Sequence, residues 1–156
     1  MLKSIEGNFD NLEVHNLLTK HFIELRAASP EGSAHVLDIR GLKVSSIKFW
    51  SLWQNEKLLG CGALKFLNKE HGEFKSIRIH DNFRKKGNGI NVINHLINEA
   101  EMLKIKRLSI ETGAGKFFKP ARKLFKQCGF KTCEPFAHYK KDINSVYLTK
   151  LINNNK

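Results

Sequence analysis

The residues best suited to chemistry lie at positions 84–90, which read Arg-Lys-Lys-Gly-Asn-Gly-Ile. The two glycines allow the backbone to bend so that successive N–H groups converge on one point. The residues that follow have helical spacing, and the first turn of a helix leaves further N–H groups unpaired and aligned with the helix dipole. The three basic side chains add charge-assisted donors. The pattern therefore predicts a phosphate-binding turn at a helix N-terminus.

The pattern of apolar residues predicts the elements that would position this turn. Residues 11–28 and 90–104 carry apolar side chains at helical spacings of three and four, and a further helix is bracketed by Pro120 and Gly129. The segment 30–46 reads as a loop around a short helix. Short apolar runs bounded by turn residues predict strands at 2–6, 47–53, 58–66, 72–79, 107–112, 136–139 and 145–151.

Composition limits the class of protein. With 156 residues and 41% apolar content, we expect one domain over residues 1–152, followed by a polar tail at 153–156. The formal charge of +12, from 27 Lys and Arg against 15 Asp and Glu, favours ligands that carry phosphate.

The three cysteines form no CxxC pair and the seven histidines show no ligand spacing, so we expect no metal and a reducing cytoplasm. No apolar run approaches the roughly 20 residues that span a bilayer, and no signal peptide is recognisable, so we expect a soluble cytoplasmic protein.

Two motifs carry a family resemblance. Residues 84–89 match the R/Q-x-x-G-x-G/A signature of the GNAT family of N-acetyltransferases, and residues 121–130 resemble the later A-x-x-L-Y-x-x-x-G-F segment of that family. Together with the order of helices and strands, the likeness covers nearly the whole chain, and other short segments resemble small bacterial members. The resemblance implies an α/β (α+β) fold with a mixed, mostly antiparallel sheet of about six to seven strands and about four helices.

The resemblance also implies a cofactor and its contacts. Acetyl-CoA would bind with its pyrophosphate on the amides of the 84–90 turn, and its pantetheine arm would pair with the strand just upstream. The residues expected to contact the cofactor are Ile77, Arg78, Ile79, Arg84, Lys85, Lys86, Gly87, Asn88, Gly89, Ile90, Phe125 and Lys126.

Acetyl transfer to an amine needs a base, because an ordinary lysine-like amine has a pKa of about 10.4 and is protonated at neutrality. Glu73 is the first candidate: it lies eleven residues before Arg84, the offset at which the resembling histone-type members carry their glutamate base. The alternative reading of Glu73 is a solvated strand residue paired with a lysine. Glu111, on the next predicted strand, is the second candidate base, and it could equally hold the amine of the acceptor.

Regular strand alternation predicts which side chains share the face of Glu73. It places Lys75, Ile77 and Ile79 on that face and Arg78 on the opposite one.

The chain departs from the family pattern at two positions. Phe125 stands where the family usually has the tyrosine that donates a hydrogen bond to the leaving thiolate. Tyr139, Tyr147, Cys128 or water could donate this hydrogen bond instead, and Tyr139 is the catalytic candidate among them. Asp81 stands where relatives often have proline before the turn, and it should alter turn rigidity more than chemistry.

The expected function is direct transfer of an acetyl group to a primary amine of a small-molecule or amino acid-like acceptor. His35 and Arg40 lie in the segment that borders the acceptor pocket in the family, so they join Glu111 as candidate acceptor contacts. The basic surface disfavours polycationic acceptors. Two alternatives remain open, a basic module associated with nucleic acid and a sensor that binds acetyl-CoA without transferring it. We expect no nucleic-acid partner, because no binding motif is present, and a homodimer stays open.

Overall fold

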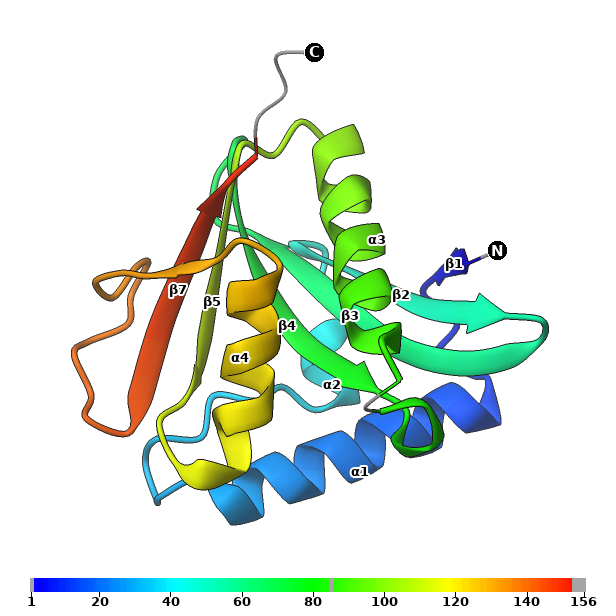
Figure 1. Ribbon diagram of the computed structural model, residues 1–156, viewed down its shortest axis with the longest axis horizontal. Helices are drawn as coiled ribbons and strands as arrows, with labels where there is room; N and C mark the ends of the chain where they lie inside the picture. Colours follow the sequence, from blue (N-terminus) through cyan, green and yellow to red (C-terminus); the bar gives the residue numbers. More distant parts are fainter. Residues whose placement is uncertain (1, 85, 153–156) are drawn as a thin grey trace.

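A seven-stranded sheet forms the centre of the molecule (Figure 1). The structure, a computed structural model, describes residues 2–84 and 86–152, so the predicted tail at 153–156 lies outside the described residues. In space the strands follow the order β1-β2-β3-β4-β5-β7-β6, and every neighbouring pair is antiparallel except β4 and β5. The expected mixed, mostly antiparallel sheet is confirmed. The strands are β1 (Lys3–Glu6), β2 (Ile47–Gln54), β3 (Lys57–Phe66), β4 (His71–Ile79), β5 (Arg107–Gly113), β6 (Lys131–Thr132) and β7 (Ser145–Leu151).

Helices cover both faces of the sheet. Helices α1 and α2 pack on one face, and α3 and α4 pack on the other (Figure 1). Within the described residues the α-helices are α1 (Leu12–Ala28), α2 (Ile39–Leu42), α3 (Asn88–Met102) and α4 (Lys119–Gln127), and two short 3-10 turns lie at Asp81–Phe83 and Lys116–Phe118. Helix α4 is thus confirmed where Pro120 and Gly129 predicted it. No helix in the described part of the chain is long and apolar enough to cross a membrane.

Helix α1 is fixed at both ends by its sequence. The Asn11 side chain accepts a hydrogen bond of 3.1 Å from the backbone N–H of Val14, which satisfies one of the unpaired amides of the first turn. The helix ends at Ala28, two residues before Pro30, which disfavours helical backbone at the residue preceding it. Its apolar stripe, which includes Leu17, packs on β2 and β3 and closes the smaller of the two cores. Each fully buried aliphatic side chain of this kind stabilises the fold by about 1.5–3 kcal/mol.

Helix α3 begins at Asn88, two residues earlier than the periodicity predicted, because Gly87 adopts a left-handed φ of 81° and acts as its N-cap. Its buried face closes the larger core. The helix approaches β3 closely at Gly62, where an added Cβ would lie 2.4 Å from a methyl carbon of Leu96. The helix is therefore held rigidly against the sheet while its N-terminus stays at the 84–90 turn.

Strands β4 and β5 separate soon after they pair. Their parallel pairing covers only His71–Glu73 of β4 and Arg107–Ser109 of β5. Beyond Glu73, β4 remains paired with β3, and β5 remains paired with β7 along its full length. The sheet is therefore split between the two parallel strands, and the β4 edge that faces β5 is unpaired there.

A β-bulge in β4 corrects the predicted side-chain faces. Ala63 of β3 pairs with Lys75 and Cys61 pairs with Arg78, so the single residue between them opposes two residues of β4. Ser76, at the bulge, has a left-handed φ of 55°. Because an extra residue reverses the alternation, Arg78 shares the α1 face with Glu73 and Lys75.

The residues on the other side of the bulge confirm this reversal. Ile77 and Ile79 belong to the core under α3, together with Phe74, so they do not share the face of Glu73. The prediction that placed them with Glu73 and opposite Arg78 was wrong, because it assumed unbroken alternation.

The predicted strand at 136–139 is also wrong. These residues form a turn between β6 and β7, in which the N–H of Tyr139 bonds to the carbonyl of Phe136 at 3.0 Å and Ala137 has a φ of 53°. Their aromatic side chains gave the strand-like pattern, but those rings pack on one another and on Tyr147 rather than in a sheet.

Candidate active site

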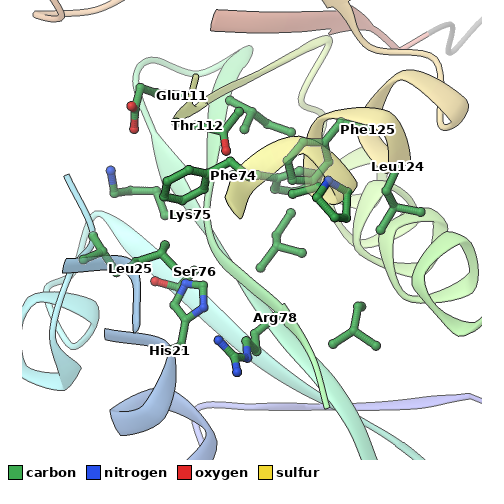
Figure 2. A pocket seen from close by; sticks show the side chains of 18 of the residues that line it. His21, Leu25, Phe74, Lys75, Ser76, Arg78, Glu111, Thr112, Leu124 and Phe125 are labelled. Atoms are coloured by element: carbon green, nitrogen blue, oxygen red, sulfur yellow. The ribbon is translucent and has the colours of Figure 1, made fainter. Parts of the chain in front are cut away.

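A pocket of about 560 Å³ opens where β4 and β5 separate. Its walls come from α1, the segment 29–37, β4, β5, the N-terminal end of α3, and α4. Figure 2 shows Lys75 and Ser76 on β4 and Glu111 and Thr112 on β5 at this opening. One pocket therefore contains both the predicted anion-binding turn and the two candidate carboxylates.

The start of α3, next to the predicted anion-binding turn, has backbone donors that are unpaired within the described residues. Gly87 caps α3 without a side-chain hydrogen bond in the described structure, so the amides of the first helical turn remain available. A Cβ on Gly89 would lie 2.8 Å from a methyl carbon of Leu124, so glycine is needed there for the approach of α3 to α4. Arg84 lines the pocket, and its Nε also donates to the carbonyl of Ile79 at 3.2 Å.

The predicted cofactor contacts fall into two groups. Most of them line the pocket, namely Ile77, Arg78, Ile79, Arg84, Gly87, Gly89, Ile90 and Phe125. The other predicted residues do not: Asn88 uses its amide to donate to the carbonyl of Phe83 at 3.1 Å, and Lys86 and Lys126 are exposed. Lys85 lies outside the described residues. The structure instead places Lys123 on the wall formed by α4.

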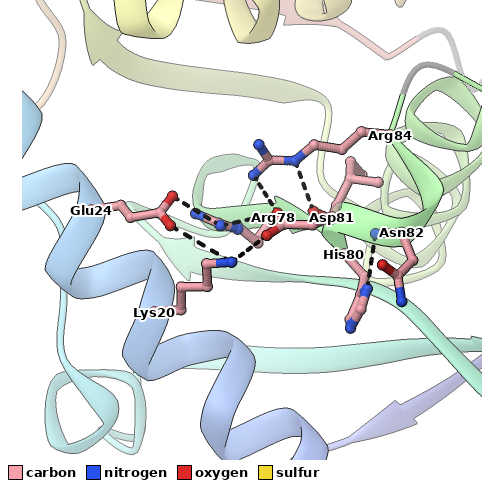
Figure 3. A network of polar contacts seen from close by, with 8 residues as sticks. Lys20, Glu24, Arg78, His80, Asp81, Asn82 and Arg84 are labelled. Atoms are coloured by element: carbon pink, nitrogen blue, oxygen red, sulfur yellow. Dashed lines mark hydrogen bonds and ion pairs between the residues drawn. The ribbon is translucent and has the colours of Figure 1, made fainter.

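A network of ion pairs ties the turn to α1 (Figure 3). Asp81 contacts Lys20, Arg78 and Arg84, with 3.3 Å from its Oδ1 to each arginine. Arg78 also pairs with Glu24 of α1 at 3.0 Å. The hydrogen bond from Lys20 is the largest of the effects that lower the pKa of Asp81. The position where relatives often carry proline thus links α1, β4 and the turn.

Glu73 is a buried carboxylate with one anchored oxygen, and only 1% of the residue is exposed. The hydroxyl of Tyr139 donates to its Oε2 at 2.6 Å, and the Lys75 ammonium lies 3.4 Å from the same oxygen. The other oxygen, Oε1, has no hydrogen-bond partner among the described residues. An anchored carboxylate with one unpartnered oxygen has the arrangement of a general base.

Tyr139 is placed to orient Glu73 rather than to donate a proton to the cofactor. Its hydroxyl donates to Glu73 and accepts from Lys75 at 3.0 Å, so its hydrogen is already used. Burial and the adjacent Glu73 charge raise the pKa of Tyr139 well above its ordinary value. The residue does not line the pocket.

Glu111 and His35 lie on the pocket wall, whereas Arg40 does not. The hydroxyl of Ser145 donates to Glu111 at 2.8 Å, and burial raises the pKa of the Glu111 carboxyl. The His35 ring packs edge-on against Tyr139 with 5.1 Å between centroids. The Arg40 side chain is 93% exposed and pairs with Asp38, so the structure does not bring it to the other candidates.

Phe125 lines the pocket and belongs to the core at the same time. The residue is 6% exposed, and its ring meets Phe130 edge-on at 6.1 Å. It gives this part of the pocket an apolar wall that carries no hydroxyl.

Buried polar atoms without partners are concentrated on the pocket wall. Among the described residues, five such side-chain atoms occur, and all belong to residues that line the pocket. They are both ring nitrogens of His21, Oε1 of Glu73, Oγ of Ser76 and Nε of Arg78. Because buried polar groups are normally paired, this concentration makes the pocket wall the candidate place for a bound ligand.

Sequence reasoning missed His21 as a site residue, although a signal for it was present. His21 follows Leu17 and Leu18 at spacings of four and three, so it continues the buried stripe of α1. Burial, together with the charges of Arg78 and Arg84, lowers its pKa from 6.5 to about 3. The buried histidine is therefore neutral.

Comparison with known proteins agrees with this geometry. The family model described as the acetyltransferase (GNAT) family matches residues 12–130. The chain is 45% identical over 138 residues to the uncharacterized N-acetyltransferase YsnE of Bacillus subtilis (strain 168), with 88% of this chain and 91% of that protein covered. It is 38% identical over 136 residues to the uncharacterized N-acetyltransferase YedL of Escherichia coli (strain K12), with 87% and 86% covered.

A solved structure shares the fold. The chain superposes on a Bacillus subtilis acetyltransferase in complex with CoA with a TM-score of 0.70 and 19% sequence identity, over 98% of this chain and 100% of that chain. At this identity the likeness concerns the fold alone.

Proposed function

The chain belongs to the GNAT acetyltransferase family, and from this premise we propose that it acetylates the primary amine of a small or amino acid-like acceptor, with Glu73 as general base. Acetyl-CoA is the donor, and it supplies an acetyl group activated as a thioester. The observation that carries the proposal is the unpartnered Oε1 of buried Glu73, which lies at the point where β4 and β5 separate.

The residues of the pocket fit this donor. The open amides at the start of α3 and the guanidinium of Arg84 suit a pyrophosphate. The unpaired edge of β4 beyond Glu73 offers backbone groups to an amide-containing arm. The apolar wall around Phe125 suits the methylene groups of such an arm.

The chain supplies the groups that would move the proton of the acceptor. An acceptor amine arrives as an ammonium, and the carboxylates of Glu73 and Glu111 on the pocket wall attract it. Oε1 of Glu73 then takes one proton, while Tyr139 and Lys75 keep Oε2 in place. The amine lone pair is thereby freed for attack, with Glu111 holding the acceptor in position.

The apolar Phe125 is compatible with transfer. A thiol with a pKa of about 8.5 is a fair leaving group near neutrality, so a donor hydroxyl is helpful but not essential. Tyr139 does not fill the role because its hydrogen bonds to Glu73. We propose that Tyr139 is a positioning residue.

Charge and size favour a small acceptor. The pocket of about 560 Å³ must hold part of the donor as well as the acceptor. The net charge of +12 repels polycations as they approach within a Debye length of about 8–10 Å. A small amine that carries few positive charges fits both limits.

The test is an assay in which a panel of primary amines is offered as acceptors. The appearance of the CoA thiol measures the rate of acetylation. Glu73→Gln should lower kcat/KM by about 100-fold or more, because it removes the base, and should leave the affinity for acetyl-CoA unchanged. Glu111→Gln is the matched control and should raise KM for the acceptor more than it lowers kcat. Full activity in Glu73→Gln would show that Glu73 is not the base.

A further inference from the structure

We infer that the acceptor carries a carboxylate, and that His21, Ser76 and Arg78 form the subsite that binds it. The inference rests on the proposed function, because it concerns the second end of the same acceptor. It narrows the amino acid-like acceptors to those with a free carboxylate, and it adds His21 and Ser76, which the sequence did not assign to the acceptor, beside Arg78.

The three residues combine burial with unused hydrogen-bonding atoms. His21 and Arg78 are 5% and 4% exposed, and each has a side-chain nitrogen without a partner among the described residues. The Ser76 hydroxyl is likewise buried and unpartnered. All three line the pocket, from α1 and from β4 (Figure 2).

The β-bulge brings these residues to one subsite. Because it reverses the alternation of β4 at Ser76, Arg78 lies on the face covered by α1, the helix that carries His21. A regular strand would have directed Arg78 into the core under α3. The subsite therefore depends on long-range packing between α1 and β4.

The donor set selects the chemistry of the ligand. Ser76 can donate its O–H, Arg78 its Nε–H and neutral His21 one ring N–H, so the three can donate at the same time. A group that accepts several hydrogen bonds through two oxygens is a carboxylate. An amide or a hydroxyl group also carries N–H or O–H donors, which cannot bond to the donors of Arg78. Such a group would therefore form fewer hydrogen bonds with the three residues and bind less tightly.

The net charge around the subsite also favours a carboxylate. Three cations, Lys20, Arg78 and Arg84, are held together by two carboxylates, Glu24 and Asp81, which leaves one positive charge in excess. An ammonium at this subsite would be repelled, whereas an anion would be attracted.

The other end of the pocket has the opposite polarity, because Glu73 and Glu111 are suited to an ammonium. An acceptor with an amine at one end and a carboxylate at the other matches both. Glu73 and Ser76 are three residues apart on β4, roughly 10 Å at about 3.3 Å per residue. Acceptors with several carbons between the two groups are therefore the appropriate probes.

The test is calorimetric titration of the CoA-saturated protein with γ-aminobutyric acid and L-lysine, and with the primary amide of each. Both acids should bind about tenfold more tightly than their amides, because only the acids present a carboxylate to three donors. Ser76→Ala should remove most of that preference. Ser109→Ala is the matched control and should retain it, since the Ser109 hydroxyl is buried but already paired with His71 and Thr149.

The outcomes separate this inference from the proposed function. Equal binding of acid and amide, tighter binding of the amide, or binding of neither would overturn the carboxylate subsite. Retention of the preference in both Ser76→Ala and His21→Leu would overturn its location. Binding does not require turnover, so an acid that binds selectively but is never acetylated contradicts the proposed function alone, and an amide that is acetylated as well as its acid contradicts only the subsite.

Discussion

The two walls of the pocket differ in how they are made. The wall formed by α3 and α4 is largely apolar and closely packed, and its polar groups are the backbone amides after Gly87 and the side chains of Lys123 and Gln127. The wall formed by α1, β4 and β5 carries Glu73, Ser76, Arg78 and His21, whose unpartnered atoms are buried.

This difference separates a wall formed by continuous segments of the chain from one formed by distant segments. The α3 wall is specified by two continuous motifs, and its amides suit the acetyl-CoA donor. The α1 wall is assembled from segments distant in sequence, so its polar pattern can change without affecting the donor site. We therefore expect variants of the α3 wall to affect acetyl-CoA, and variants of the α1 wall to affect the acceptor and the base.

The largest expected effect comes from Gly87→Glu on the α3 wall. The substitution forces a side chain into a left-handed φ of 81° and places a negative charge beside the proposed pyrophosphate site. We expect the Kd for acetyl-CoA to rise by about 100-fold or more in a calorimetric titration at about 0.15 M salt.

Gly7→Glu is the matched control. Gly7 has a φ of 78° and, like Gly87, open space around its missing Cβ, but it does not line the pocket. It should carry a similar backbone strain and leave the Kd unchanged. A similar loss of affinity in both variants would mean that strain, not the turn, explains the result.

The next largest effect concerns Glu73 on the α1 wall. Tyr139→Phe removes the hydroxyl that anchors Glu73 and keeps the ring, so kcat should fall by about tenfold while the Kd for acetyl-CoA stays constant. Tyr147→Phe is the control, because the Tyr147 hydroxyl bonds to the carbonyl of Lys140 instead. If steady-state kinetics show the same kcat for Tyr139→Phe and the wild type, the anchoring role is wrong.

An effect of comparable size concerns stability. Below about pH 6.5 the unfolded chain protonates His21, whereas the folded protein excludes the proton until about pH 3, so the free energy of unfolding falls as the pH drops through this window. Between about pH 7.5 and 5 the loss from this group is about 2 kcal/mol. Urea unfolding of His21→Leu should lack that loss. His15→Leu, on the exposed side of α1, keeps His21 and should keep the wild-type pH dependence.

The smallest effect is expected from Arg40→Ala. The side chain is 93% exposed and lies outside the pocket, so KM for the acceptor should change by less than about twofold. A larger rise in KM would show that Arg40 of α2 also binds the acceptor, and it would contradict the division between the two walls.

Local patterns predicted the α3 wall well. The glycine turn, the helix after it and the helix from Pro120 all follow from short-range spacing, and the structure contains each of them. The family, its fold and its acetyl-CoA donor were likewise predicted from two motifs and are confirmed.

The α1 wall was predicted less well, because its contacts join distant parts of the chain. The pairing of Tyr139 with Glu73 spans 66 residues, and a turn rather than the predicted strand makes it possible. The position of Arg78 depends on a bulge opposite Gly62 that no periodicity in β4 reveals. The apolar stripe of α1 is enough to predict that His21 is buried. The lack of hydrogen-bond partners for its ring nitrogens can be seen only in the folded structure.

The bulge at Ser76 also reverses, within a single strand, which residue positions face α1. Upstream of it, odd-numbered positions such as Glu73 face α1, and downstream of it an even-numbered position, Arg78, does so. Deletion of Ser76 alone would remove the bulge without turning Arg78, because Arg78 would then follow Lys75 by two positions and would still face α1. The extra residue at the bulge, rather than any one side chain, therefore reconciles the odd spacing between Lys75 and Arg78 with their common position on the face of the candidate site.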